Sequence, residues 1–262
     1  MNRKHVLWKL FVSTLYLSAF TFGGGYVIVT LMKEKFVDEL HWMEEDEMLD
    51  LIAIAQSAPG AIAVNGAIVV GYKLAGLIGA LVAILRLGKS KVLRAVATVY
   101  TEVIRDTPLL LQLYFFYFLL PDILPALKLS KFACITIALV INSGAYMSEV
   151  FRSGIQSIDR GQTEAARSLG LSARQTMMRI ILPQAFKNVL PAMCNEFVAV
   201  TKETSLASTF YVGDLMTQYQ TISGKTYLVI EPLVIIGVIY FVVTFSMSKL
   251  ITVLERRLKN DD

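Results

Sequence analysis

The sequence predicts an all-α integral membrane protein with about six transmembrane helices and a cytoplasmic helical loop between the fourth and the fifth. Composition is the first reason. Hydrophobic residues make up 55% of the 262 residues and charged residues 18%, whereas soluble globular domains contain about 45–50% and 25%. The second reason is that the apolar residues gather in runs too long for the core helices of a soluble protein. The third is that Lys and Arg gather in alternate connecting segments. Together these observations argue against a water-soluble enzyme.

The apolar runs give the positions of the expected spans. A bilayer core about 30 Å thick requires about 20 mostly apolar residues per helix. Six segments meet or approach that length: 6–32, 60–86, 96–120, 131–151, 191–212 and 229–251. Polar residues such as Asn65, Lys73 and Arg105 interrupt the second and third spans. The first run is long and lacks an A-x-A-like site, so we expect a span there and not a cleaved signal peptide.

The Lys and Arg residues set the expected orientation, because positively charged loops remain in the cytoplasm. They cluster before span one, after span two, between spans four and five, and after span six: Arg3, Lys4, Arg86, Lys89, Lys91, Arg94, Arg152, Arg160, Arg167, Arg174, Arg179, Lys187, Arg256, Arg257 and Lys259. All of these groups lie on one side if the spans alternate. The other side then receives the acidic segment 33–57, together with 121–130 and 213–228. We therefore expect both termini in the cytoplasm.

The sequence offers little for metal or covalent chemistry. Cys134 and Cys194 both lie in apolar stretches, and His5 and His41 are far apart, so neither a disulfide nor metal-ligand spacing is indicated. The run 83–90 fits only a loosened phosphate-loop pattern, and it follows a membrane helix instead of a strand. With a net charge of +4 and no dense basic run, nucleic-acid binding is not expected either. We predict no catalytic residues, no metal and no cofactor.

The polar segment 152–190, between spans four and five, is predicted to form an ordered pair of short helices. Residues 162–168 favour a helix, and Gly170 lies where the end of a helix requires left-handed backbone. Ser172, with a glutamine three residues later, forms a capping box that starts a second helix, and we expect Pro183 to end that helix. Two such helices joined by a glycine form a compact projection suited to docking into a partner.

The same segment carries a motif with long and specific spacing. Glu164-Ala165-Ala166 is followed after three residues by Gly170, and after nine more by Ile180-Ile181-Leu182-Pro183. This spacing resembles the EAA coupling loop of ABC-transporter permeases. Four other segments resemble motifs of the permeases for polar amino acids (glutamine/histidine type): 102–112, 142–146, 195–197 and 255–258. The resemblance covers about 84–262, and Asp106 departs from it, since the family usually has glycine there.

The resemblance implies a division of labour between several subunits. ATP is bound by a separate ATPase dimer, and the coupling loop fits a cleft on that dimer. The other implied partners are an extracytoplasmic solute-binding protein, a second permease copy or a related permease, and a polar amino-acid substrate. The implied location is the bacterial cytoplasmic membrane. The residues expected to couple to the ATPase are Gln162, Glu164, Ala165, Ala166, Gly170, Ile180, Leu182 and Pro183.

Polar residues inside the spans indicate a substrate path, because such residues are costly in lipid and usually face a cavity or another helix. Four of them, at spacing i, i+1, i+4 and i+7, share roughly one face of span four. Span five carries a charged cluster, and a zwitterionic amino acid needs both charges nearby. The alternative, which the residues support equally, is that these charges pair with one another structurally. The candidates are Thr107, Gln112, Asn142, Ser143, Tyr146, Glu149, Glu196, Lys202, Glu203 and Ser205.

Residues 1–80 differ from the first span of such a permease and resemble the N-terminal part of the chromate transporter family. The resemblance rests on a glycine motif, an acidic helix around Trp42, an AQxxPG break and a following segment: 22–27, 42–50, 55–60 and 70–76. Helix breaks such as Pro59-Gly60 are tolerated at membrane depth where they line a cavity. The alternative, which we prefer, is a packing segment in which 60–86 takes the place of the permease's own first span.

The chain is therefore expected to join two parts, a chromate-transporter-like membrane segment at 1–80 and an ABC permease domain at 81–262, as in a fusion or chimera. The expected function is that of a permease subunit in an ATP-driven importer for polar amino acids. Two alternatives are a secondary anion transporter of the chromate type and a non-transporting fusion that only docks an ATPase.

Overall fold

The computed structural model describes most of the chain: residues 37–38, 44–46, 48–49 and 62–260. The first expected span, most of the acidic segment, and the glycine and Pro59-Gly60 motifs lie outside these residues. Every regular element in the described part is helical, which confirms the all-α prediction. The chain divides into two compact units, one with Tyr72–Lys128, Ile137–Val200 and Met247–Asp262, the other with Met1–Gly71, Leu129–Thr136 and Thr201–Ser246.

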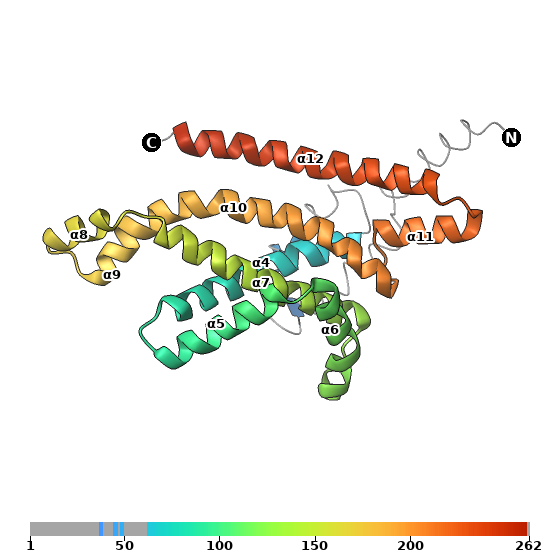
Figure 1. The fold of residues 1–262 in the computed structure, drawn as a ribbon, viewed down its shortest axis with the longest axis horizontal. Coiled ribbons are helices and arrows are strands. Elements are labelled where there is room, and N and C mark those ends of the chain that lie inside the picture. The colour runs from blue at the N-terminus through green and yellow to red at the C-terminus, as the bar shows by residue number, and fades with distance from the viewer. Residues whose placement is uncertain (1–36, 39–43, 47, 50–61, 261–262) are drawn as a thin grey trace. The chain divides into compact units, whose positions relative to one another are not determined.

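Figure 1 labels the helices along the chain. In order they are α4 (Ile62–Leu87), α5 (Lys91–Asp106), α6 (Leu109–Ile123), the 3-10 turn η2 (Pro125–Leu127), α7 (Lys131–Gln156), α8 (Arg160–Ser168), α9 (Ala173–Thr176), the π-helical turn η3 (Met177–Ile181), α10 (Leu182–Glu203), the 3-10 helix η4 (Thr204–Phe210), α11 (Leu215–Thr226) and α12 (Ile230–Asn260).

Several helices in the described part are long enough to cross a bilayer. α7 and the stretch Ile230–Val253 of α12 are long and apolar enough by themselves, and α5 and α6 qualify only as a bent pair. α4 has 26 residues, which at about 1.5 Å per residue exceeds a hydrocarbon core of about 30 Å. The spans expected at 60–86, 131–151 and 229–251 thus correspond to single helices. The total of six remains a prediction, because 6–32 lies outside the described residues.

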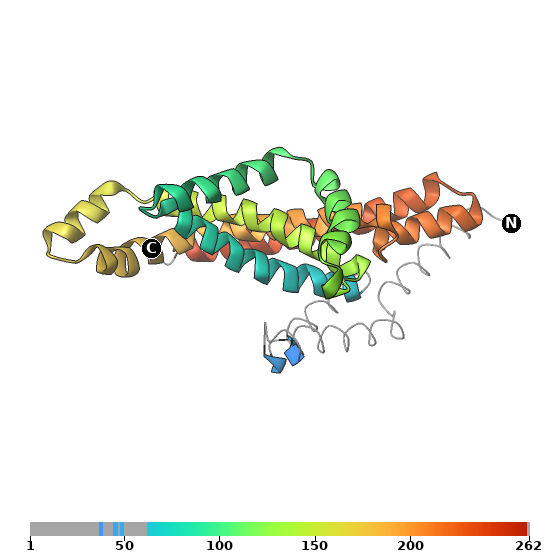
Figure 2. The ribbon, with the colours of Figure 1, turned by 90° about the horizontal axis from the view of Figure 1, so that it is seen from below.

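The prediction of one helix over 96–120 is wrong. α5 ends at Asp106, α6 begins at Leu109, and the two helices differ in direction by 107°, a bend that Figure 2 shows. The cause is Pro108, which has no N–H and whose ring forces the preceding residue out of helical backbone. Thr107 accordingly has extended backbone, with φ −107° and ψ 143°.

Glycines allow α4 and α7 to pack with their backbones close together. A Cβ added to Gly79 of α4 would lie 2.5 Å from Cβ of Met147, and one added to Gly144 of α7 would lie 2.9 Å from Cγ2 of Ile78. A Cβ added to Gly76, one turn before Gly79, would meet nothing within 4 Å. Small residues at such contacts are typical of membrane helices, which associate through close packing because lipid supplies no hydrophobic driving force.

In the described part of the other compact unit, α11 packs against the first half of α12. A buried apolar cluster there consists of Leu215, Ile235, Ile236 and Ile239. Asp214 caps α11 by accepting a hydrogen bond from the N–H of Thr217 at 2.7 Å, which is the usual role of an aspartate at this position.

Candidate functional site

The predicted coupling loop extends from a closed stem formed by the end of α7 and the start of α10. A Cβ added to Gly154 of α7 would lie 2.1 Å from Cγ2 of Val189 of α10, so the two helices approach as closely as glycine allows. Beside this contact, Nδ2 of Asn188 donates to Oγ of Ser157 at 3.0 Å. Two views show α8 and α9 projecting beyond the paired ends of α7 and α10 (Figures 1 and 2). The stem thus links the loop mechanically to both helices.

Hydrogen-bonded caps fix both ends of α8. At the start, Oδ1 of Asp159 accepts the N–H of Gly161 at 2.6 Å, a cap that the sequence analysis did not identify. At the end, Gly170 has φ +83°, and the N–H of Leu171 donates to the carbonyl of Ala166 at 3.1 Å. This is the Schellman arrangement, in which a residue with left-handed backbone closes the helix. The prediction that Gly170 has left-handed backbone at the end of this helix is confirmed.

The capping box that starts the second helix is also confirmed. The N–H of Gln175 donates to Oγ of Ser172 at 3.2 Å, and the N–H of Ser172 donates to Oε1 of Gln175 at 2.8 Å. Each side chain therefore satisfies a backbone N–H that the first turn of a helix leaves without a partner. The short helix α9 is held in place largely by these local bonds.

The prediction that Pro183 ends this second helix is wrong. α9 passes into the π-helical turn η3 and then directly into α10, whose second residue is Pro183. The N–H of Leu182 donates to the carbonyl of Met177, five residues back. The π-helical turn already departs from the α-helical hydrogen-bond pattern, so the missing N–H of Pro183 falls where no regular i→i−4 series is broken. The expected span at 191–212 therefore begins earlier, and the helix runs without interruption from the loop into α10.

The predicted coupling residues differ in exposure. Gln162, Glu164, Ala165, Gly170 and Pro183 are exposed, Ile180 and Leu182 are half-buried, and Ala166 is buried. The exposed members can contact a partner, whereas Ala166 packs inside the loop. The buried apolar residue of the π-helical turn is Ile181, which the prediction did not single out.

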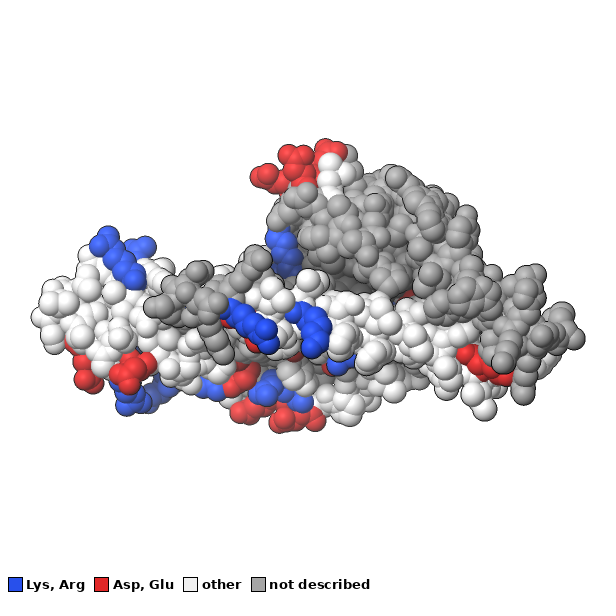
Figure 3. Space-filling view, turned by 90° about the horizontal axis from the view of Figure 1, so that it is seen from above, with Lys and Arg blue, Asp and Glu red and all other residues white. Residues whose placement is uncertain are grey.

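Two further features of the loop lie outside the predicted coupling residues. Leu169 is 84% exposed and Met178 is 57% exposed, so each offers an apolar side chain to a partner. Basic side chains accompany the acidic Glu164 on α8, α9 and η3, and all are exposed: Arg160, Arg167, Arg174 and Arg179. The space-filling view shows both signs of charge at this end of the unit (Figure 3). The exposed surface area of these apolar and basic side chains is known only from the structure.

Three of the predicted substrate-path residues meet at the break between α5 and α6. Nε2 of Gln112 donates to the carbonyl oxygens of Ile104, at 2.7 Å, and Thr107, at 3.1 Å, and also to Oγ1 of Thr107 at 2.9 Å. Its Oε1 accepts from Nδ2 of Asn142, in α7, at 2.9 Å. Gln112 and Asn142 are buried. The Gln112 side chain therefore satisfies carbonyl groups that the bend leaves outside the helical pattern, and its bond with Asn142 connects the break to α7.

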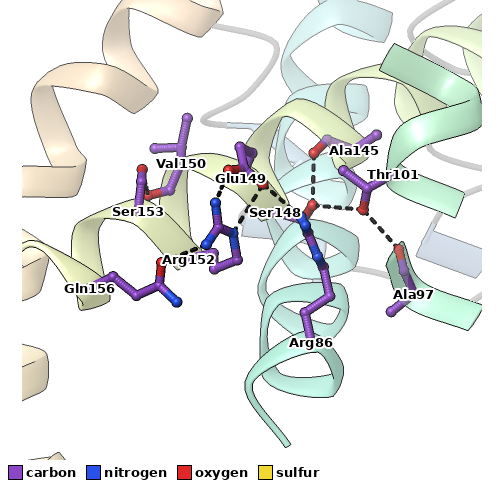
Figure 4. A network of polar contacts seen from close by, with 10 residues as sticks. All are labelled: Arg86, Ala97, Thr101, Ala145, Ser148, Glu149, Val150, Arg152, Ser153 and Gln156. Carbon is purple, nitrogen blue, oxygen red and sulfur yellow. Dashed lines mark hydrogen bonds and ion pairs between the residues drawn. The ribbon is translucent and has the colours of Figure 1, made fainter. Parts of the chain in front are cut away.

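Glu149 lies in an ion-pair network at the other end of α7 (Figure 4). Its Oε2 accepts from Nη1 of Arg86, in α4, at 2.6 Å and from Nε of Arg152 at 3.1 Å. Next to it, Oγ of Ser148 lies 3.4 Å from Oγ1 of Thr101 in α5. This part of α7 is thus bonded to both α4 and α5. Because Glu149 already has two cationic partners, a structural role is favoured over contact with substrate.

The remaining substrate-path candidates do not form one group within either unit. Ser143 is buried in α7, and Glu196 belongs to the same compact unit. Lys202, Glu203 and Ser205 belong to the other unit. Lys202 is exposed, and the Ser205 carbonyl accepts the hydroxyl of Ser208 at 2.7 Å. Glu196 therefore belongs to a different unit from the other members of the predicted charged cluster of span five.

Tyr146, the last of these candidates, contacts Arg105, which the sequence analysis noted as an interruption of a span and as part of the permease-like segment 102–112. Cζ of Arg105 lies 5.4 Å from the centroid of the Tyr146 ring. This distance is within the range of a cation–π interaction. Arg105 is exposed and Tyr146 half-buried.

Residues 75–260 match the family described as the inner membrane component of binding-protein-dependent transport systems. The chain belongs to this family. The arginine transport system permease protein ArtQ of Bacillus subtilis (strain 168) is 39% identical over 202 residues, which are 77% of this chain and 92% of that protein. The putative glutamine transport system permease protein GlnP of Rickettsia bellii (strain RML369-C) is 38% identical over 182 residues, which are 70% of this chain and 83% of the relative.

Solved structures agree with this assignment. A crystal structure described as an amino acid ABC transporter with histidines contains a chain that is 38% identical, with a TM-score of 0.70, covering 82% of this chain and 99% of that one. The MetNI methionine ABC transporter in an inward-facing conformation gives a TM-score of 0.55 at 17% identity, which supports the fold alone. The similarity to polar amino-acid permeases stated from the sequence is thus confirmed.

The N-terminal part matches a second family. Residues 8–114 match the chromate transporters, which confirms the similarity stated for 1–80. This match extends beyond residue 80 and overlaps the permease family over 75–114.

Proposed function

We propose that this chain is the permease subunit of an ATP-driven importer for polar amino acids in a bacterial cytoplasmic membrane, with both termini on the cytoplasmic side. The observation that carries the proposal is the coupling loop. Two capped helices extend from a closed stem and present an exposed Glu164. The substrate class follows from relatives whose names refer to arginine and glutamine transport and to an amino acid ABC transporter.

In the proposed cycle, a separate ATPase dimer binds two such loops, one from each of two permease subunits. The exposed Ala165 allows the loop helix to approach the ATPase closely, while Glu164 pairs with a donor at the edge of the cleft. Closure of the ATPase on ATP draws the two loops together. Because the stem joins each loop to α7 and α10 at Gly154 and Val189, both helices move with it. The permease then opens outward and accepts substrate from a solute-binding protein.

The coupling contact is tested by purifying the tagged chain from its source membranes in a mild detergent and identifying what accompanies it. We expect an ABC-type ATPase with the unaltered chain and its loss from Glu164→Arg, because the substitution reverses a charge on an exposed surface. Asp122→Arg is the matched control, since it reverses an exposed acid in a segment expected on the opposite side of the membrane. If the unaltered chain retains no ATPase under conditions that retain one on a known permease, the proposal fails.

A second candidate function, secondary transport of an oxyanion, is favoured by the match of residues 8–114 to the chromate transporters. We also propose that the two parts join near residue 80. Two measurements separate the candidates. A secondary transporter takes up chromate in proteoliposomes that contain no ATPase. Glu164→Arg should abolish ATP-driven amino-acid uptake and leave chromate uptake unchanged. A chain that only docks an ATPase retains the partner in detergent while accumulating neither amino acid nor chromate.

A further inference from the structure

We propose that Arg105, held over the ring of Tyr146, binds the carboxylate of the transported amino acid. The inference rests on the proposed function, since it names the group that recognises the substrate of that transporter. Three observations carry it: the depth of Arg105 in the membrane, the direction of its guanidinium, and the charges beside it.

Arg105 lies next to the break in the bent pair α5 and α6, which together are long and apolar enough to cross a membrane. It follows the first residue of α5, Lys91, by fourteen positions, which corresponds to about 21 Å along the helix axis. Tyr146 lies ten residues before the end of α7, or about 15 Å from it. Both positions fall inside a hydrocarbon core about 30 Å thick. An ionisable side chain at such a depth is costly in lipid, and it usually faces a water-filled path or a partner.

The guanidinium of Arg105 lies over an aromatic ring of a neighbouring helix. Its Cζ lies 5.4 Å from the centroid of the Tyr146 ring, so the side chain is directed across the unit to α7. In the part of the chain that the structure describes, neither Glu102 nor Asp106 forms an ion pair with it. Stacking on an aromatic ring orients a guanidinium while leaving its N–H donors available. Two parallel N–H donors match the two oxygens of a carboxylate.

The surroundings of Arg105 suit a zwitterion. Glu102 and Asp106 are exposed on the same side of α5, one turn before Arg105 and directly after it. An amino acid brings one negative and one positive group, so both of its charges meet an opposite charge on this face. Arg105 also adjoins the break between α5 and α6, and transporters of other folds often bind substrate near a break of this kind at mid-membrane depth.

The test measures equilibrium binding of radiolabelled L-arginine and L-glutamine to the purified permease with its ATPase in lipid nanodiscs, without the solute-binding protein. Agmatine, which is L-arginine without its carboxylate, is the comparison probe. We expect Arg105→Gln to weaken binding of both amino acids about tenfold or more, since hydrogen bonds between charged groups are lost, and to leave agmatine binding unchanged. A purely structural role would change binding of all three probes alike.

Further variants keep the test decisive. Arg105→Lys keeps the charge but loses the two-pronged geometry, so it should weaken amino-acid binding less than Arg105→Gln while remaining folded. Tyr146→Leu should weaken amino-acid binding, whereas Tyr146→Phe should not, because only the aromatic ring is needed to orient the guanidinium. Arg94→Gln, which removes an exposed arginine at the cytoplasmic end of the same helix, is the matched control and should bind as the unaltered chain does.

The failures of the two proposals are distinguishable. If the unaltered complex retains its ATPase through Glu164 and the folded Arg105 variants bind amino acids normally, the carboxylate site is wrong and the proposed function stands. If that complex retains its ATPase but binds neither amino acid, the carboxylate site is wrong, whereas the proposed contact of the loop with the ATPase stands. If no ATPase is retained and neither amino acid binds, both proposals fail.

Discussion

The coupling loop and the packed helices α4, α5, α6 and α7 are stabilised in opposite ways. In the loop, the bonds that define the structure join residues close in sequence, such as Ser172 with Gln175, and the residues proposed to act are exposed. Among the helices, the defining contacts join distant residues, such as Gly79 with Met147 and Gln112 with Asn142, and most of these side chains are buried.

This difference indicates how the two regions divide the work. A loop held by its own caps keeps its shape while its outer surface changes partners, so it suits docking. Helices joined by close contacts and buried polar bonds have few alternative arrangements, because tightly packed interiors do not deform continuously. Substitutions in the loop should therefore alter partner binding at little cost in stability, whereas substitutions among the helices should lower stability directly.

The largest effect is expected from Gly79→Ala. The added Cβ would lie 2.5 Å from Cβ of Met147 and 3.0 Å from its carbonyl carbon, so α4 and α7 must move apart. Overpacking of this kind typically costs about 1–3 kcal/mol, and we expect the upper end because backbone atoms are involved. Thermal unfolding of the purified protein in detergent measures the change as a lower Tm.

Gly76→Ala is the matched control for this prediction, since it makes the same change one turn earlier in α4, where the added Cβ meets nothing within 4 Å. Alanine favours a helix over glycine by up to about 1 kcal/mol, so the control should be neutral or slightly stabilising. Equal losses from both variants would show that close packing of α4 on α7 is not what distinguishes these helices from the loop.

An intermediate effect is expected from Gln112→Leu. The leucine removes the donor to the carbonyl groups of Ile104 and Thr107 and leaves the amide of Asn142 without its acceptor. A buried polar group without a partner costs about 1–3 kcal/mol, and water entering the bend offsets part of this, so we expect a loss of about 2 kcal/mol. Urea or thermal unfolding at a fixed detergent concentration measures it.

The same chemical change at Gln162, in the exposed loop, provides the comparison. Gln162→Leu should alter stability by less than about 0.5 kcal/mol, as is usual for surface positions, although it falls in the proposed ATPase contact. If Gln162→Leu destabilises the protein as much as Gln112→Leu, the loop is part of the cooperative core and the division between the regions is wrong.

The sequence predicted the loop better than the helix contacts, because the loop is stabilised by bonds between residues close in sequence. Capping boxes and C-terminal glycines act over three to six residues, so Ser172 and Gly170 could be assigned from their neighbours alone. The bend at Pro108 and the continuation of the helix through Pro183 show the limit of this reasoning. A proline either breaks a helix or begins one, depending on the turn before it, and the π-helical turn at Met177–Ile181 has no clear signature in the residues.

Side-chain partners were least predictable, because they depend on how helices pack. The spacing of polar residues in span four correctly placed Asn142 and Glu149 in α7. It could not show that one bonds Gln112 while the other pairs with Arg86 and Arg152. The contact of Arg105 with Tyr146 joins residues 41 positions apart in sequence, so a single sequence carries no local signal for it.

The smallest effect is expected from Ser172→Ala, and it tests whether the loop folds as a local unit. The substitution removes the hydroxyl that accepts the N–H of Gln175, and loss of such a cap costs about 1 kcal/mol. Because this bond is local, hydrogen exchange of the amides of α9 should quicken about fivefold, while Tm and exchange in α7 remain unchanged. Ser168→Ala, in α8, removes an exposed hydroxyl that caps no helix and should leave exchange in α9 unaltered. If Ser172→Ala lowers the Tm, α9 unfolds together with the membrane helices. The loop that the ATPase is proposed to bind would then be as rigid as the spans, and not a separate local unit.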